Sequence, residues 1–139
     1  MRIGELARSD VVTVPLNASL VTVAETMRDA GVGSVVVMDG GKPRGIVTDR
    51  DLVVYGLADD ADPTSSTAKT VMEEDLFTVD VNQDVFATTV EMRERAVRRV
   101  PVLDDGSLAG IITLDDLLVV LAEELAALAA VIEAEFPPR

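Results

Sequence analysis

The sequence contains one unit twice, with an offset of about 65 residues and no gap. The matching segments are residues 10–14 with 75–79, 27–28 with 92–93, and 45–52 with 110–117. Roughly a third of the aligned positions are identical. Two copies favour a pair with two-fold pseudosymmetry, because open arrays usually need at least about three repeats to bury a continuous core. Any site that one copy forms is therefore expected again in the other.

The composition narrows the classes of function. Of the 139 residues, 48% are hydrophobic and only 3% are aromatic, so Val, Leu, Ile and Ala should fill the core of one compact body. A formal net charge of −13 argues against a nucleic-acid partner. Cysteine and histidine are absent, which excludes disulfides, thiolate metal sites and the usual general base at neutral pH. We therefore expect no enzyme.

The excess of acidic residues, 25 against 12 basic ones, has two interpretations. It is typical of a salt-loving cytoplasm, and equally of a merely acidic protein whose genome favours Arg codons. Both interpretations predict a fold that is more stable in salt than in dilute buffer. The start lacks the layout of a secretion signal and no apolar run approaches about 18 residues, so we expect a cytoplasmic protein without a membrane partner.

Each copy predicts the order β-α-β-β-α. Ser19 and Asp84 are N-cap residues in front of the first helix of each copy, and Gly31 is a natural stop for that helix in the first. Two β-branched runs around a Gly-containing turn then predict a hairpin, and a second helix opens near Thr48 and Thr113. The strands are apolar on both faces, so the two sheets should pack on each other in one α+β body.

A long final helix is expected from Asp115 to about Glu135, where Pro137 and Pro138 stop it. Its apolar stripe is Leu118, Leu121, Leu125, Leu128 and Ile132. The stripe either folds back on its own chain or, as we favour, docks on a second subunit in a homodimer. The chain is thus divided into repeat 1 (1–58), a linker (59–67), repeat 2 (68–121) and a helical extension (122–139).

A short motif recurs where the second helix of each copy begins. Residues 45–51 and 110–116 share the form Gly, two apolar residues, Thr, two variable residues, Asp. The Thr lies at a helix N-terminus, which favours anions, and the Asp could accept hydrogen bonds from vicinal ribose hydroxyls. The same spacing also forms a helix capping box without any ligand. The motif alone leaves both interpretations open.

Together with the β-α-β-β-α order and the Val-Pro-Val run before Asp104, the doubled motif resembles the tandem CBS (cystathionine β-synthase type) domain pair. The resemblance covers about Gly4 to Leu121. It implies a disk-like body with two clefts that bind adenosine-bearing ligands such as AMP, ADP, ATP or S-adenosylmethionine. It also implies a homodimer and a regulated partner protein, which the sequence does not name.

Carried over by position, the resemblance assigns ribose recognition to Thr48 with Asp51 and to Thr113 with Asp116. The other copy is implied to contribute Val12, Thr13, Val32, Gly33 and Ser34 opposite Thr113 and Asp116, and Phe77, Thr78, Val97, Arg98 and Arg99 opposite Thr48 and Asp51.

The two clefts are not expected to be equal. Arg98 and Arg99 stand where the first copy has Gly33 and Ser34, so the cleft of Thr48 and Asp51 is predicted to favour a phosphorylated ligand. Alternatively, the two arginines pair with surface carboxylates. No obligatory cofactor is expected, and Mg²⁺ would arrive only with a nucleotide.

The sequence therefore predicts a regulatory module that senses energy or metabolite state through an adenosine ligand. A constitutive dimeric scaffold is the alternative, and a nucleotide hydrolase is a third hypothesis.

Overall fold

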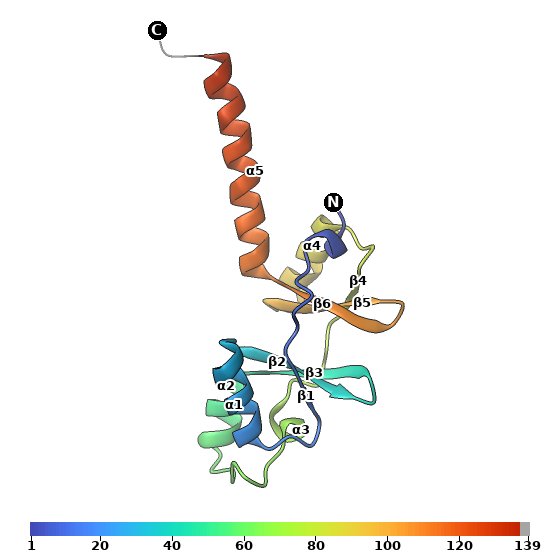
Figure 1. Ribbon diagram of the computed structural model, residues 1–139, viewed down its shortest axis with the longest axis vertical. Coiled ribbons are helices and arrows are strands. Elements are labelled where there is room, and N and C mark those ends of the chain that lie inside the picture. The colour runs from blue at the N-terminus through green and yellow to red at the C-terminus, as the bar shows by residue number, and fades with distance from the viewer. Residues whose placement is uncertain (137–139) are drawn as a thin grey trace.

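The computed structural model describes residues 1–136, and within them each repeat forms one three-stranded sheet (Figure 1). Repeat 1 contains β1 (Thr13–Pro15), β2 (Ser34–Asp39) and β3 (Lys42–Thr48), and repeat 2 contains β4 (Val79–Asp80), β5 (Arg99–Asp104) and β6 (Ser107–Thr113). In both sheets the first two strands are parallel and the last two antiparallel. Strands β3 and β6 bring the two sheets into contact. The predicted α+β fold of two β-α-β-β-α units is confirmed.

The first helix of each repeat is α1 (Leu20–Ala30) or α4 (Val85–Arg95), and both begin at the predicted cap. Ser19 Oγ accepts a hydrogen bond from the Thr22 backbone N at 3.1 Å, and Asp84 Oδ2 accepts one from the Ala87 backbone N at 3.1 Å. Both helices end in a left-handed residue, Gly31 in repeat 1 and Ala96, with a φ of 54°, in repeat 2. Glycine adopts this conformation without strain, but alanine does not.

The second helices differ in length. In repeat 1, the single turn α2 (Asp49–Asp51) continues as a π-helical segment, η2 (Leu52–Leu57). In repeat 2, α5 (Leu114–Glu135) runs for 22 residues and projects beyond the rest of the body (Figure 1). This confirms the predicted long helix. The two prolines expected to stop it, and the last three residues of the predicted extension, lie outside the described residues.

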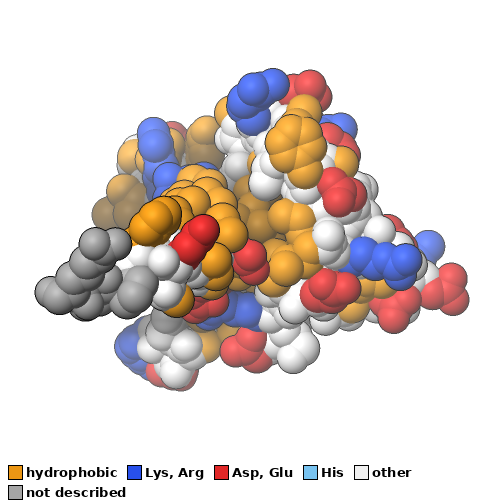
Figure 2. All heavy atoms as spheres, turned by 90° about the horizontal axis from the view of Figure 1, so that it is seen from above, with side chains coloured by type: hydrophobic (Ala, Val, Ile, Leu, Met, Phe, Trp, Pro, Cys, Tyr) orange, Lys and Arg blue, Asp and Glu red, His pale blue; other side chains and the backbone are white. Residues whose placement is uncertain are grey.

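The apolar stripe of α5 does not fold back on its own chain. The side chains of Leu121, Leu125 and Leu128 are 55%, 59% and 63% exposed. Figure 2, which looks at the molecule from above, shows hydrophobic side chains gathered near the end of the chain. The alternative in which this stripe is covered by the same chain is therefore wrong.

Two separate cores stabilise the repeats, and each contains a segment from the other half of the chain. Ile3, in the 3-10 helix η1 (Ile3–Glu5), is fully buried in the core of repeat 2. Ala68, in α3 (Ala68–Val71), is fully buried in the core of repeat 1. The first segment of each repeat thus packs on the other repeat, an exchange that the sequence did not predict.

The exchange continues in backbone hydrogen bonds at equivalent positions. The backbone N of Arg8 donates to Ile111 O at 2.9 Å, and the backbone N of Glu73 donates to Ile46 O at 2.9 Å. Residues 8 and 73 differ by the repeat offset, as do 46 and 111. Each crossing segment therefore runs along β3 or β6 of the opposite repeat and forms one side of a cleft there.

Candidate functional site

One cleft between the repeats brings together most of the residues that were predicted to surround Thr113 and Asp116. Its volume is about 380 Å³, within the range of small-molecule sites. We call it the Arg8 cleft, and its lining is Arg8, Asp10, Val11, Val12, Gly31, Val32, Gly33, Ser34, Val36, Arg99, Ile111, Thr113, Asp115 and Asp116. Repeat 1 thus supplies an apolar wall, and repeat 2 supplies the Thr and Asp of the motif. Thr13, which was predicted here, is not part of the lining.

The motif forms a capping box in both repeats. Thr113 Oγ1 accepts from the Asp116 backbone N at 3.1 Å, and the Thr113 backbone N donates to Asp116 Oδ2 at 3.2 Å. The corresponding distances for Thr48 and Asp51 are 3.1 Å and 2.8 Å. Because the box uses only Oδ2 of each Asp, Oδ1 can still accept a hydrogen bond from another group. Capping and ligand recognition are therefore compatible at these residues.

In the Arg8 cleft, the second carboxylate oxygen of Asp116 is held by an arginine. Arg8 donates from Nε at 3.0 Å and from Nη2 at 2.9 Å, both to Asp116 Oδ1. The Asp116 side chain is only 12% exposed, whereas that of Arg8 is 67% exposed. Arg8 was not predicted as a site residue, because no periodic pattern in the sequence links it to Asp116, 108 positions away. The one available signal was the alignment of Arg8 with Glu73, which marks a reversal of charge between the copies.

The two predicted phosphate arginines occupy different places. Arg99 pairs with Thr113 across β5 and β6 and lines the Arg8 cleft. Arg98 Nη2 lies 3.4 Å from Asp115 Oδ1, an exposed ion pair of the kind that the alternative interpretation described. The sequence had grouped both with Thr48 and Asp51. In the structure Arg99 lines the Arg8 cleft, and neither arginine lines the Glu73 cleft.

The pocket on the other side is smaller, and all its lining residues belong to repeat 2. It measures about 280 Å³, and we call it the Glu73 cleft. Its lining is Glu73, Asp75, Phe77, Arg95, Ala96 and Val97. Of the residues predicted for this side, Phe77 and Val97 line it, whereas Thr78, Thr48 and Asp51 do not. The Arg95 guanidinium lies 4.6 Å from the centre of the Phe77 ring, a cation–π contact.

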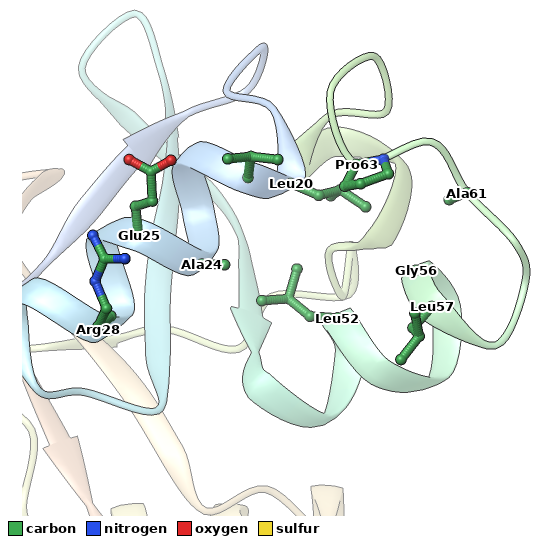
Figure 3. Close-up of a pocket in the computed structure, with 10 residues that line it drawn as sticks. Leu20, Ala24, Glu25, Arg28, Leu52, Gly56, Leu57, Ala61 and Pro63 are labelled. Atoms are coloured by element: carbon green, nitrogen blue, oxygen red, sulfur yellow. The ribbon is translucent and has the colours of Figure 1, made fainter.

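Two further grooves lie away from the clefts and are mainly apolar. One, of about 510 Å³, runs between α1 and η2 (Figure 3). Leu20, Ala24, Leu52 and Leu57 face it, and Arg28 and Glu25 stand at its edge. The other, of about 500 Å³, lies between α4 and α5. Apolar grooves between helices are typical of surfaces that bind another helix.

Residues 1–136 contain no group of three acidic, Cys or His side chains placed to hold a metal ion. No helix in the same range has the length and apolar character needed to cross a membrane. The Arg8 cleft is lined by both repeats and contains Thr113 and Asp116, whereas every lining residue of the Glu73 cleft belongs to repeat 2, so the Arg8 cleft is the candidate site.

Comparison with known proteins identifies a family. The model of the CBS domain matches twice, at residues 3–57 and 68–123. A relative from Methanopyrus kandleri is 37% identical over 118 residues, which cover 84% of this chain and 60% of that protein. Hypoxic response protein 1 of Mycobacterium tuberculosis is 32% identical over 114 residues, 81% of this chain and 80% of that one.

Solved structures agree with the sequence comparison. The crystal structure of Hypoxic Response Protein I with two coordinated zinc ions has a TM-score of 0.77 and 31% identity, over 85% of this chain and 97% of that chain. A CBS domain protein from Pyrobaculum aerophilum complexed with AMP has a TM-score of 0.74 and 25% identity, over 84% and 89% of the two chains.

Proposed function

The chain belongs to the CBS domain family as a tandem pair, and from this premise we propose that it is a cytoplasmic regulatory module that binds an adenosine-containing molecule between its repeats. The observation that carries the proposal is the Arg8 cleft, in which Thr113 and Asp116 of repeat 2 face Val12 and Val32 of repeat 1. The AMP complex of the Pyrobaculum protein supports this class of ligand. We assign the protein no catalytic role.

The proposed binding mode uses the two kinds of wall in the cleft. Ribose hydroxyls donate to Asp116 Oδ1, the oxygen that the capping box does not use, and there they replace the exposed Arg8 guanidinium. The adenine lies among the aliphatic side chains of Val12, Val32 and Val36, since small-molecule sites combine apolar walls with a few polar groups. No cofactor is required, and Mg²⁺ enters only as the counter-ion of nucleotide phosphates.

Both repeats line the Arg8 cleft, so a ligand bound there could transmit a signal through their relative arrangement. A ligand that touches both repeats changes their relative arrangement only as far as it binds one arrangement more tightly than another. We propose that the chain acts as a homodimer and that a partner protein detects the change. The exposed apolar stripe of α5 and the two apolar grooves supply the surface for the second copy.

A constitutive dimeric scaffold is the second candidate function, and one observation favours it. Both capping boxes are complete without any ligand, so Thr48, Asp51, Thr113 and Asp116 already have a structural role. In a scaffold, α5 would be the functional element and the clefts would be empty spaces between packed repeats. The two candidates differ in whether any adenosine compound binds.

Thermal unfolding in high salt with AMP, ADP, ATP and S-adenosylmethionine tests the proposal. A ligand present at about 100 times its Kd should add about 2.7 kcal/mol of stability. The Asp51→Ala, Asp116→Ala double variant should abolish the shift. Asp84→Ala is the matched control, because it removes a helix cap outside both clefts and should keep the shift.

No shift with any of the four compounds would favour the scaffold. An unchanged shift in the double variant would overturn the assigned site. Product analysis after incubation with ATP separately tests the hydrolase hypothesis, and the proposal predicts that no ADP or AMP is formed.

A further inference from the structure

The second half of α5 lies outside the family match and has no packing partner in the single chain. The match to the CBS domain ends at residue 123, whereas α5 continues to Glu135. Every residue from 121 to 135 is exposed, and this stretch projects away from both repeats (Figure 1). Helices of about 12–15 residues are marginal in water without tertiary packing, so the projecting stretch needs a surface to pack on.

The apolar residues of α5 follow the heptad pattern of a coiled coil, in which positions a and d form a seam. The seam residues are Leu118, Leu121, Leu125, Leu128 and Ile132. Their side chains are 54–63% exposed. The neighbouring e positions hold Ala122 and Ala129, whose small side chains let a second helix approach closely. The seam is therefore suited to pair with another helix.

The charges of α5 decide which direction a second copy of this helix can take. Between 114 and 135 the helix contains six acidic residues and no Lys or Arg: Asp115, Asp116, Glu123, Glu124, Glu133 and Glu135. A parallel pair would place each carboxylate at the level of the same carboxylate in the other copy. It would also bring together the two helix C-termini, which carry a partial negative charge. In a chain of net charge −13, a parallel pair is therefore disfavoured.

An antiparallel pair avoids this repulsion. The acids are separated by two uncharged stretches, 117–122 and 125–132. When the second helix is reversed so that Leu125 faces Leu128, the acids at 123–124 stand at the level of residues 129–130. The acids at 133 and 135 stand at the level of residues 120 and 118. Each acidic cluster then meets an uncharged stretch, and the two helix dipoles also oppose each other favourably.

The same register pairs the seam with itself. Leu125 of each copy faces Leu128 of the other, and Leu121 faces Ile132. A shift of one heptad toward the bodies would bring the two Glu123 side chains to the same level, so the charges also favour this register over its neighbour. A surface that is complementary to its own reversed copy is the requirement for a two-fold symmetric dimer.

The reversed helix would also cover the groove between α4 and α5. Leu118 and Leu121 belong both to the seam and to the lining of this groove. Phe86, which also lines it, is 74% exposed. Because Ile132 of the second copy lies over Leu121 in this register, the last turns of that copy reach the mouth of the groove.

We propose that α5 forms an antiparallel coiled coil with α5 of a second copy, with Leu125 opposite Leu128. The two helices overlap at residues 118–135, over about 27 Å. Because α5 projects from one end of the body, the two CBS bodies lie at opposite ends of the helix pair (Figure 1). This inference rests on the homodimer in the proposed function and narrows it to one arrangement.

Disulfide cross-linking of the full chain tests the direction of the pair. The sequence contains no cysteine, so introduced thiols are the only ones. Leu121→Cys combined with Ile132→Cys should give a covalent dimer on a non-reducing gel after oxidation. Each single variant should stay unlinked, because two copies of the same position lie about 16 Å apart, beyond the reach of a disulfide. Ala127→Cys with Ala130→Cys, on the opposite face of the helix, is the control and should stay unlinked.

Sedimentation velocity of the wild-type chain distinguishes failure of this arrangement from failure of the homodimer. A dimer in which either single variant links as readily as the double variant would show a parallel pair. A dimer that the double variant does not link would show that α5 is not the contact. Both results overturn the antiparallel coiled coil and leave the homodimer intact. A wild-type monomer would overturn both, while adenosine binding is tested independently by thermal unfolding.

Discussion

Arg8 Nη2 lies 2.9 Å from Asp116 Oδ1, although the two residues are 108 positions apart in the chain. Arg8 belongs to the segment that crosses onto repeat 2, and Asp116 lies in the first turn of α5. The ion pair therefore joins the crossing N-terminal segment to the helix that projects from the body. It connects a candidate ligand site with a candidate interaction surface.

Removing this ion pair should cost a small, salt-dependent amount of stability. For Arg8→Met we expect a loss of about 1 kcal/mol in dilute buffer, because the carboxylate is largely buried but the arginine is mostly exposed. The loss should shrink in about 1 M NaCl, where the Debye length is about 3 Å. Urea unfolding at both salt concentrations measures it. Arg28→Met, which removes an ion pair exposed on both sides, serves as control and should cost almost nothing.

The crossing N-terminal segment should contribute strongly to the stability of repeat 2. Ile3→Ala removes a fully buried side chain, and we expect a loss of about 2–5 kcal/mol. Hydrogen exchange of amides in β5 and β6 should accelerate, because these strands share a core with Ile3. Glu5→Ala alters an exposed residue of the same 3-10 helix and should have little effect. Equal losses for the two variants would contradict the exchanged arrangement.

Substitutions at the two helix ends, Gly31 and Ala96, should have opposite effects on the stability of the protein. Ala96→Gly should stabilise the protein by about 1 kcal/mol, because alanine is strained in the left-handed conformation. Gly31→Ala should destabilise it by a similar amount, and purely through the backbone, since an added Cβ meets no atom within 4 Å. Thermal denaturation of both variants measures the pair, and changes of the same sign would refute the assignment of the caps.

The stripe on α5 should hold two copies together. Leu121→Asp with Leu128→Asp should convert a dimer into monomers, because both side chains are exposed in the single chain and would lose an apolar interface. Sedimentation velocity gives the state of association. Ala127→Asp with Ala130→Asp adds the same charge on the opposite face of the helix and should leave the dimer intact. Sedimentation identical for both double variants and the wild type would rule out this interface.

Salt should separate the two interpretations of the acidic composition. With a net charge of −13, the melting temperature should rise from dilute buffer to about 1 M NaCl, as self-repulsion is screened. A plateau above that concentration indicates a merely acidic protein. A rise that continues to several molar NaCl indicates adaptation to a salt-rich cytoplasm. A melting temperature that falls with added salt would contradict both.

Local features were predictable from the sequence because their causes are local. The predicted helix caps act on backbone groups within one helical turn, and the structure confirms them at Ser19, at Gly31 and at the Thr and Asp of each motif. The π-helical continuation of α2 was not predicted, because no residue pattern in that segment distinguishes it from an ordinary helix.

The site was only partly predictable, since its composition depends on contacts between distant segments. The resemblance implied that one group of residues lies opposite Thr113 and Asp116. In the structure they line the Arg8 cleft together with that pair, and they are Val12, Val32, Gly33 and Ser34. Arg8 reaches the cleft because the first segment of repeat 1 crosses onto repeat 2. No periodic pattern in the sequence predicts such a crossing. The place of Arg99 in the Arg8 cleft was not predicted, because alignment compares equivalent positions and does not show which cleft a side chain lines.

The first segment of each repeat packs on the other repeat. The molecule is therefore equivalent to a domain-swapped dimer whose two subunits have been joined into one chain. Ile3 completes the core of one half, and Ala68 completes the core of the other. Neither half expressed alone would contain a whole hydrophobic interior, and a protease cut in the linker at 59–67 would leave two fragments that remain associated.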